Sequence, residues 1–309
     1  MDRTAATGAR PAPGSRPYDM RRLSYAGTFK NPLKANTIRA IEWTTAKIQL
    51  LRLIRDFERS GAPFGVPFWH KAIRQMGIDI QTPQHEIRRI PATGPVVVAA
   101  NHPHGLVDGM ILCELVARRR PDFKILTRSL LTGIPEIEEF MIPVPFPHED
   151  NARELGLEMR ENTMKTLKAG GAVILFPAGR VAMSEGWWGP AIEGEWNVFT
   201  HKIVRSSGAA IVPVRFTGQN SRTFQIANQL SDTLRQGLLL YEIKRALFRP
   251  QRPHIGEPIP ASVLKDWTGN PRGFLGWLRE HTLALGTGRS ADPADFPLSR
   301  FATGRDADA

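Results

Sequence analysis

A short apolar segment that ends in a histidine-rich turn constrains the fold of this chain more than any other feature. Residues 96–100 read Val-Val-Val-Ala-Ala, which is typical of a parallel strand buried on both faces. The segment breaks at an Asn-His-Pro-His-Gly turn over residues 101–105, and a helical pattern of apolar residues then runs to Val116. Open α/β sheets bind their ligands at the carboxyl ends of such strands. The pattern therefore predicts an α/β sheet with its functional site beside this turn.

The turn places an imidazole and a carboxylate within reach of each other. His102 leaves the end of the predicted strand, and Asp108 falls in the first turn of the predicted helix. A general base needs this pairing, because the carboxylate fixes the imidazole tautomer and stabilises the imidazolium. A structural interpretation is equally open at this point. Aspartate is favoured in the first turn of any helix by the helix dipole, and His-Pro and His-Gly turns need not be catalytic.

Three further apolar segments, residues 123–127, 172–176 and 210–216, alternate with helical patterns and extend the prediction to a whole sheet. The predicted fold class is α/β, with a mixed, mostly parallel sheet flanked by helices. The carboxyl ends of parallel strands meet at one edge, so the residues that follow them are expected to face a single site. Arg128 and Arg180 follow two of these strands, and an arginine fork binds phosphate or carboxylate bidentately.

Outside this sheet the patterns are less regular. Residues 78–80 and 86–90 resemble two strands of a hairpin, and residues 224–248 resemble one long helix. The predicted organisation has four parts: a disordered leader over residues 1–30, an amphipathic helical pair over 31–77, an α/β domain over 78–285 and a flexible tail over 286–309.

The helical pair has two interpretations. Basic residues are interleaved with the apolar face of the predicted helix at residues 38–57, and a shorter helix is predicted at 68–76. A basic amphipathic helix suits a lipid interface. The same pattern also fits an ordinary surface helix that packs on the core.

Charge points to a polyanionic partner. The formal net charge of the 309 residues is +11, with 41% hydrophobic residues, and nucleic acid or anionic lipid would match it. The basic residues are scattered and no nucleic-acid recognition motif is found, which favours an anionic membrane surface over nucleic acid. No segment reaches the roughly 18 consecutive apolar residues of a spanning helix. The single cysteine, Cys113, lies in an apolar helical pattern and is expected to be a buried thiol in a reducing compartment.

The histidine turn carries a resemblance to a known family. Asn101-His102-Pro103 with Asp108-Gly109 resembles the first signature box of the glycerolipid acyltransferase superfamily, the lysophospholipid acyltransferases of the PlsC type. The usual box has four residues between His and Asp, whereas five separate His102 from Asp108 and three separate His104 from Asp108. Subgroups with a proline after the histidine have the longer form. The resemblance therefore implies His102 as the catalytic base and Asp108 as its partner, with His104 as the rival base.

The other boxes of the family are partly altered. Residues 176–180, Phe-Pro-Ala-Gly-Arg, resemble the third box, Phe-Pro-Glu-Gly-Thr-Arg, with Pro177 and Gly179 matching and Ala178 in place of the glutamate. Arg180 stands at the threonine of that box. Residues 211–214 match the fourth box, and the second box, expected at 141–147, lacks its arginine. The resemblance implies that Arg128, Pro177, Gly179 and Arg180 bind substrate.

The function that the resemblance implies is acyl transfer to the hydroxyl of a lysolipid. The donor would be acyl-CoA or acyl-carrier protein as co-substrate, with no bound cofactor and no metal. The protein would lie peripherally on the cytoplasmic face of the inner membrane. Residues 213–222 and 255–258 also resemble a hemolysin-like branch with relatives that acylate lyso-ornithine lipid. The alternative is a catalytically silent basic module that binds anionic membrane or nucleic acid.

Overall fold

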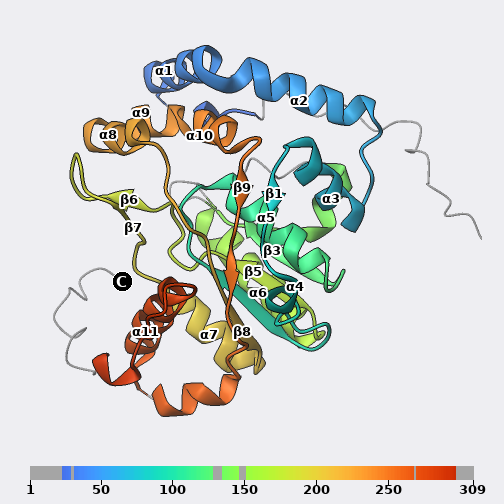
Figure 1. Cartoon of the computed structure of the whole chain (residues 1–309), viewed down its shortest axis with the longest axis vertical. Helices are drawn as coiled ribbons and strands as arrows, with labels where there is room; N and C mark the ends of the chain where they lie inside the picture. Colours follow the sequence, from blue (N-terminus) through green and yellow to red (C-terminus); the bar gives the residue numbers. More distant parts are fainter. Residues whose placement is uncertain (1–22, 29–30, 128–133, 146–150, 268, 297–309) are drawn as a thin grey trace, which may run out of the picture.

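One mixed sheet forms the centre of the molecule (Figure 1). The computed structural model describes residues 23–28, 31–127, 134–145, 151–267 and 269–296. In these residues the sheet has six strands in the order β10-β8-β2-β5-β3-β4, parallel except for β10. The strands are β2 (Val96–Ala100), β3 (Phe123–Thr127), β4 (Met141–Pro143), β5 (Ala172–Leu175), β8 (Ala210–Arg215) and β10 (His254–Ile255). The fold class and the four principal strands predicted from the sequence are confirmed.

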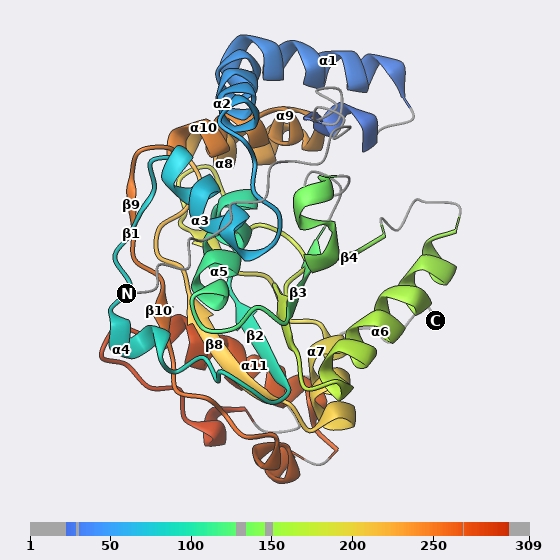
Figure 2. The ribbon, with the colours of Figure 1, turned by 90° about the vertical axis from the view of Figure 1, so that its right-hand side faces the viewer.

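Helices cover both faces of this sheet (Figure 2). The α-helices are α1 (Pro32–Glu42), α2 (Ile48–Arg59), α3 (Val66–Gln75), α4 (Gln84–Ile87), α5 (Leu106–Ala117), α6 (Ala152–Lys168), α7 (Val198–Ser207), α8 (Arg222–Leu230), α9 (Asp232–Gly237), α10 (Leu239–Ala246) and α11 (Pro271–Ala284). A π-helical segment, η2 (Trp43–Lys47), joins α1 to α2, and the 3-10 helices are η1 (Tyr25–Thr28), η3 (Pro135–Phe140), η4 (Ala261–Trp267) and η5 (Pro293–Asp295). No helix in the described part of the chain is long and apolar enough to cross a bilayer.

Strand β2 divides the core into two halves. Val96 and Val98 pack into the cluster that contains α3 and α5, whereas Val97 and Ala99 pack into the cluster that contains α7 and α11. Every residue of the strand is buried. Side chains alternate between the faces of a strand, so a continuous apolar run is what a strand covered on both sides requires.

The predicted helical pair packs extensively on the rest of the molecule. Helix α1 contacts α9, η2 contacts α10, and α3 contacts α5. Trp69 of α3 is fully buried, with its ring against Phe123 and Phe140. The apolar face of α3 therefore belongs to the core. Large apolar side chains of the first two helices and their linker, Leu33, Trp43 and Ile48, remain exposed.

Two predictions of local structure are wrong. Within residues 86–90, predicted as a strand, the described structure has the end of α4, and Glu86 turns inward to accept a hydrogen bond from the backbone of Ile255. Strand β1 (Asp79–Ile80) pairs instead with β9 (Pro250–Gln251). The long helix predicted at 224–248 is three helices, because Ser231 ends α8 and caps α9, and α9 ends at Gly237.

Candidate active site

The histidine turn lies at the carboxyl edge of the sheet, between the end of β2 and the start of α5. Gly105 adopts a φ of 77°, which allows the chain to turn sharply into the helix. Asp108 is the third residue of α5 and is fully buried. Its Oδ2 accepts the backbone N–H groups of His104 at 2.7 Å and Gly105 at 3.2 Å. The structural role expected of an aspartate in a first helical turn is thus present, because Asp108 satisfies amides at the start of α5.

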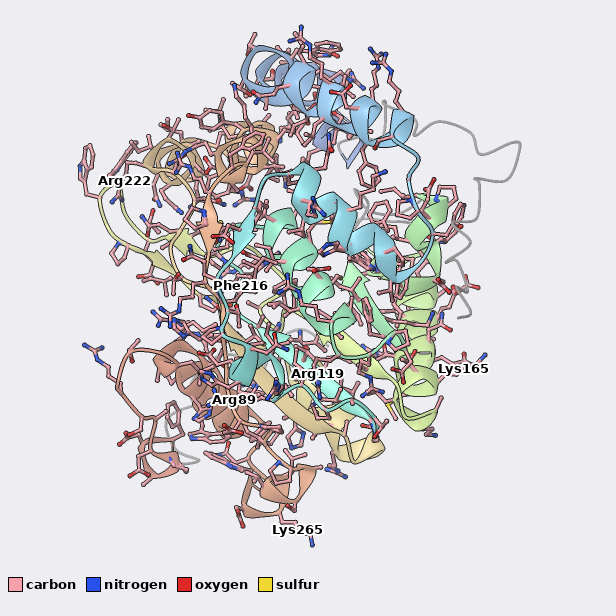
Figure 3. All side chains as sticks on the ribbon, turned by 45° about the vertical axis from the view of Figure 1, so that its right-hand side comes forward. Arg89, Arg119, Lys165, Phe216, Arg222 and Lys265 are labelled. Atoms are coloured by element: carbon pink, nitrogen blue, oxygen red, sulfur yellow. The ribbon has the colours of Figure 1, made fainter. Side chains whose placement is uncertain are left out.

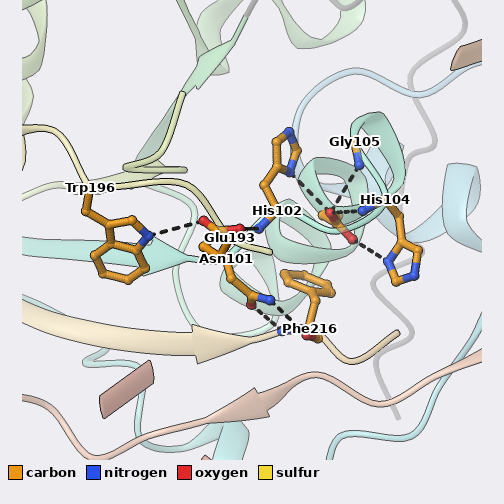
Figure 4. Close-up of polar contacts among 8 residues, drawn as sticks. Asn101, His102, His104, Gly105, Glu193, Trp196 and Phe216 are labelled. Carbon is orange, nitrogen blue, oxygen red and sulfur yellow. Dashed lines mark hydrogen bonds and ion pairs between the residues drawn. The ribbon is translucent and has the colours of Figure 1, made fainter. Parts of the chain in front are cut away.

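The same carboxylate also holds both histidines of the turn (Figure 4). Nδ1 of His104 lies 3.0 Å from Oδ1 of Asp108 in a hydrogen bond, and Nδ1 of His102 lies 3.2 Å from Oδ2. The second contact is at ion-pair distance but lacks the alignment of a hydrogen bond. Both predicted partners of Asp108 are therefore brought to it. Each ring turns its Nδ1 to the carboxylate, which leaves Nε2 for other contacts.

Burial and charge act in opposite directions on this cluster. Burial by itself would lower the pKa of His104, but the charge and hydrogen bond of Asp108 outweigh it and raise that pKa. Burial would raise the pKa of Asp108, yet the charge of His104 and the contacts from both imidazoles lower it. The charged forms of Asp108 and His104 therefore stabilise each other.

His102 is fixed by residues from three other segments. Its ring stacks on Phe176 with 3.9 Å between ring centres. Its backbone N–H donates to Oε2 of Glu193 at 3.1 Å, and its carbonyl accepts from the backbone of Ala182 at 2.9 Å. Before it, the Asn101 side chain makes two hydrogen bonds to the backbone of Phe216, beyond β8. The loop that carries His102 is therefore held on both sides.

Glu193 is the residue of this site that sequence reasoning missed. It is buried and accepts one hydrogen bond from His102 and one from Nε1 of Trp196, at 3.1 Å each. Burial raises its pKa. Glu193 and His102 are 91 positions apart in the sequence, so no local pattern links the two residues.

The altered third box forms a turn next to the site. Gly179 has a φ of 64° and donates its backbone N–H to the carbonyl of Phe176, while the carbonyl of Pro177 accepts from Asn197. Arg180 is exposed and its guanidinium lies against Gly194. Pro177 and Gly179 thus shape the backbone at this strand end. Arg128, the other predicted arginine, lies outside the described residues.

Two cavities are bordered by residues close to the histidine turn or in contact with it. An apolar cavity of about 170 Å³ is lined by Leu106 and Met110 of α5 together with side chains of α2 and α3. A polar cavity of about 1220 Å³ is lined by Ala178, Arg180 and Glu193. Leu106, which follows the turn, therefore borders the apolar cavity, and Glu193, which contacts the backbone of His102, borders the polar cavity.

Side chains of the segment after β8 contact backbone of the neighbouring hairpin. Oε1 of Gln219 accepts from the backbone of Ala191, and the Arg222 guanidinium donates to the carbonyl of Gly189. Ser221 caps α8 and also donates to Glu242. These side chains support neighbouring backbone. Within the described residues no group of three or more His, Cys, Asp or Glu side chains could hold a metal ion.

Comparison with known proteins agrees with this geometry. Residues 82–217 match the sequence model of the acyltransferase family, a range that includes β2, the histidine turn, the third box, Glu193 and β8. No curated protein matches the chain. Among solved structures, the 1-acyl-sn-glycerophosphate (LPA) acyltransferase PlsC from Thermotoga maritima is similar over 82% of this chain and 81% of that chain, with 15% sequence identity and a TM-score of 0.45. Residues 82–217 therefore match an acyltransferase domain, in line with the resemblance that the His-Asp motif carries.

Proposed function

We propose that this protein transfers a fatty acyl group from an acyl thioester, carried by CoA or acyl-carrier protein, to the hydroxyl of a lysolipid. The observation that carries the proposal is the buried Asp108 carboxylate with the Nδ1 atoms of two imidazoles at 3.0 and 3.2 Å. An imidazole oriented through Nδ1 presents Nε2 as a proton acceptor, which is the arrangement of a general base.

His102 is the proposed base. The family spacing implies it, and two observations support it. The ring is held by stacking on Phe176 and by backbone contacts on both sides, so it is preorganised. The raised pKa of His104 leaves less of that ring in the neutral form, and only the neutral form can accept a proton. A small rotation of the His102 ring would align its Nδ1–H with Asp108.

The proposed reaction needs no acyl-enzyme. Nε2 of His102 takes the proton of the lysolipid hydroxyl as the oxygen attacks the thioester carbonyl, and the C–O bond forms. When the tetrahedral intermediate collapses, the C–S bond breaks and the imidazolium returns the proton to the leaving thiolate. Asp108 stays ionised throughout and stabilises the imidazolium. Proton and electron pairs balance without a metal or redox partner.

The two cavities suit the two parts of an amphiphilic substrate. The apolar cavity beside Leu106 would take an acyl chain, and the polar cavity beside Arg180 would take a head group or the phosphates of the donor. Arg180 and Arg128 are the proposed anion-binding residues, and Pro177 and Gly179 shape the turn that presents Arg180. A lysophosphatidic acid is the first acceptor to test, with a phosphate-free lyso-ornithine lipid as the second.

We place the protein on the cytoplasmic face of the inner membrane, as a peripheral protein. The net charge of +11 and the exposed apolar side chains of the N-terminal helices support this placement. The experiment that tests the function is a panel of lysolipids incubated with radiolabelled acyl-CoA or acyl-carrier protein. Formation of a labelled diacyl lipid is expected. Binding to anionic vesicles without turnover of any donor and acceptor pair would support the catalytically silent module instead.

A further inference from the structure

A short hairpin beside the site carries two tryptophans into solvent. Strands β6 (Met183–Ser184) and β7 (Ala191–Ile192) pair in antiparallel register, and residues 185–190 form the tip. Trp187 is 49% exposed and Trp188 is 77% exposed. Single exposed apolar residues are common on protein surfaces, but two adjacent indoles at one tip form a concentrated apolar surface. These side chains line neither of the two cavities described above.

Side chains of the segment that follows β8 hold the hairpin along its length, and Figure 3 labels one of them, Arg222. In addition to the contacts of Gln219 and Arg222 described above, the backbone N–H of Ser184 donates to Oε1 of Gln225 at 2.8 Å. The carbonyl of Ser184 accepts from Nε2 of Gln229 at 2.6 Å. Four side chains from one neighbouring segment therefore fix both strands and the tip. Because these contacts already order the tip in the folded protein, a partner that binds it loses little further conformational entropy.

The base of the hairpin is continuous with the catalytic machinery. Ala182, immediately before β6, and Glu193, immediately after β7, are the two residues that hold the backbone of His102. Figures 1 and 3 place the hairpin beside α8, in the half of the molecule that also carries α1. A partner that docks on the tip would therefore contact the same hairpin whose base holds the backbone of His102.

We infer that the tip formed by Trp187 and Trp188 docks on the interface of an anionic lipid bilayer. Indole rings prefer the membrane–water interface, because the ring is apolar and its N–H remains hydrated. The positive charge of the chain matches anionic lipid. The proposal rests on the proposed function in one respect, since a lysolipid acceptor lies in such an interface. Docking itself requires no turnover, so the two can fail separately.

The test is cosedimentation with vesicles of phosphatidylglycerol and phosphatidylcholine, with no acyl donor present. The variant is Trp187→Ser with Trp188→Ser, and the matched control is Leu157→Ser, which removes another exposed apolar side chain. The vesicle affinity of the double variant is expected to fall by about tenfold or more, because two indoles leave the interface. Leu157→Ser is expected to bind as the wild type does. A double variant that binds as tightly as the wild type would overturn the proposal.

Two further measurements separate docking from damage to the fold. Trp187→Phe with Trp188→Phe is expected to recover most of the lost affinity, and vesicles with brominated acyl chains are expected to quench the wild-type tryptophan fluorescence more than that of the serine variant. Equal quenching would count against insertion at this tip. If the serine variant bound vesicles normally but lost binding to purified acyl-carrier protein, the tip would be a protein-docking surface and the lipid assignment would be withdrawn. A His102→Ala protein is expected to dock as the wild type does, whatever its turnover.

Discussion

Asp108 has both of the roles that the sequence left as alternatives, at the start of a helix and as the partner of a histidine. Its carboxylate accepts amides at the start of α5 and also contacts the imidazoles of His102 and His104. A buried carboxylate with this many donors stays ionised, and its charge is available to whichever ring is protonated. Removing it would disturb the helix as well as the chemistry. Tests of the site are therefore cleaner at the histidines than at Asp108.

The first prediction compares the two histidines. His102→Ala is expected to lower kcat by about 10²–10⁴-fold, because general-base catalysis is worth that much. His104→Ala is expected to lower it far less, since that ring serves mainly to pair with Asp108. Turnover is measured at saturating lysolipid, with circular dichroism to confirm folding. An inactive His104→Ala protein beside an active His102→Ala protein would reverse the assignment.

The second prediction concerns pH. The pKa of His104 in the folded state is raised above its ordinary value of 6.5. The ion pair of His104 with Asp108 therefore stabilises the fold fully below pH 6.5, and this stabilisation is lost as pH rises through the raised pKa. The pKa of Asp108 is lowered below 3.8, so the same pair is lost only as pH falls through that lowered value. The free energy of unfolding of wild type minus that of His104→Asn is expected to be largest between these two ordinary values. Chemical denaturation across the pH range measures it, and a difference that is constant with pH would contradict the ion pair.

The third prediction concerns Glu193 as a positioning residue. Glu193→Ala leaves the backbone N–H of His102 without its partner, and the loop is expected to shift. A misplacement of about 1 Å costs on the order of 10²-fold in rate. The loss is expected in kcat, with the KM for the acyl donor nearly unchanged. Glu193→Gln keeps an acceptor oxygen and is expected to recover part of the rate. A loss confined to KM would assign Glu193 to substrate binding.

The fourth prediction concerns Arg180. Charge-assisted hydrogen bonds contribute about 1.5–3 kcal/mol, so Arg180→Ala is expected to raise the KM for lysophosphatidic acid by about 10–100-fold. A phosphate-free lysolipid is expected to be spared. The control is Arg205→Ala, an exposed arginine on α7 that lines neither cavity. Equal losses on both acceptors would move Arg180 to the donor or to the transition state.

At the scale of elements, long buried runs were predicted well and short amphipathic segments were not. Strands β2, β5 and β8, which precede the described site segments, are almost wholly apolar, and a short buried apolar run between turn signals favours a strand. The segment at 224–248 has a helical period throughout, but Ser231 supplies a cap in its middle and Gly237 lets the chain approach Ile41 of α1. These interruptions depend on tertiary contacts that no local pattern contains.

The candidate site divides in the same way. The approach of His102 to Asp108 was predicted, because it depends on one turn and one helix start, whereas His104 was only the rival for that place and the contact of both rings with Asp108 was not predicted. The role of Glu193 was not predicted, because it depends on a hairpin that returns to the turn from a remote part of the sequence. The contacts of Gln219 and Arg222 with the backbone of that hairpin were likewise not predicted, because they join segments that are remote in the sequence.

The fifth prediction compares how much α3 and the η2 segment between α1 and α2 contribute to the stability of the fold. Trp69 is fully buried between α5 and the sheet, so Trp69→Ala is expected to lower the free energy of unfolding by about 3–5 kcal/mol. Trp43→Ala, at an exposed tryptophan, is expected to lower it by less than about 1 kcal/mol. Urea unfolding measures both. Comparable small effects would mean that α3 is a peripheral element, as its amphipathic pattern alone allowed.

At the scale of the whole molecule, the elements around the histidine turn border two kinds of cavity. The apolar cavity is bounded by the N-terminal helices and α5, and the polar cavity by the segment around the third box, the hairpin base and α11. Under the proposed function, the acyl chain and the charged head of the substrates would divide between these two cavities. The proposed docking tip would bring the protein to the membrane interface, where such amphiphilic molecules are found.

The central place of β2 in the sheet also determines when, during synthesis of the chain, the site can assemble. Its neighbours β5 and β8 are both later in the chain, and the hydrogen bonds that hold the turn join residues 91 and 115 positions apart. During synthesis, which proceeds from the N-terminus, His102 leaves the ribosome long before Glu193 and Phe216. A nascent chain that stops before β5 carries the whole His-Asp motif without Phe176, Glu193 and Phe216. The full set of contacts around His102 is therefore acquired late in synthesis, once the last parallel strand, β8, has paired with β2.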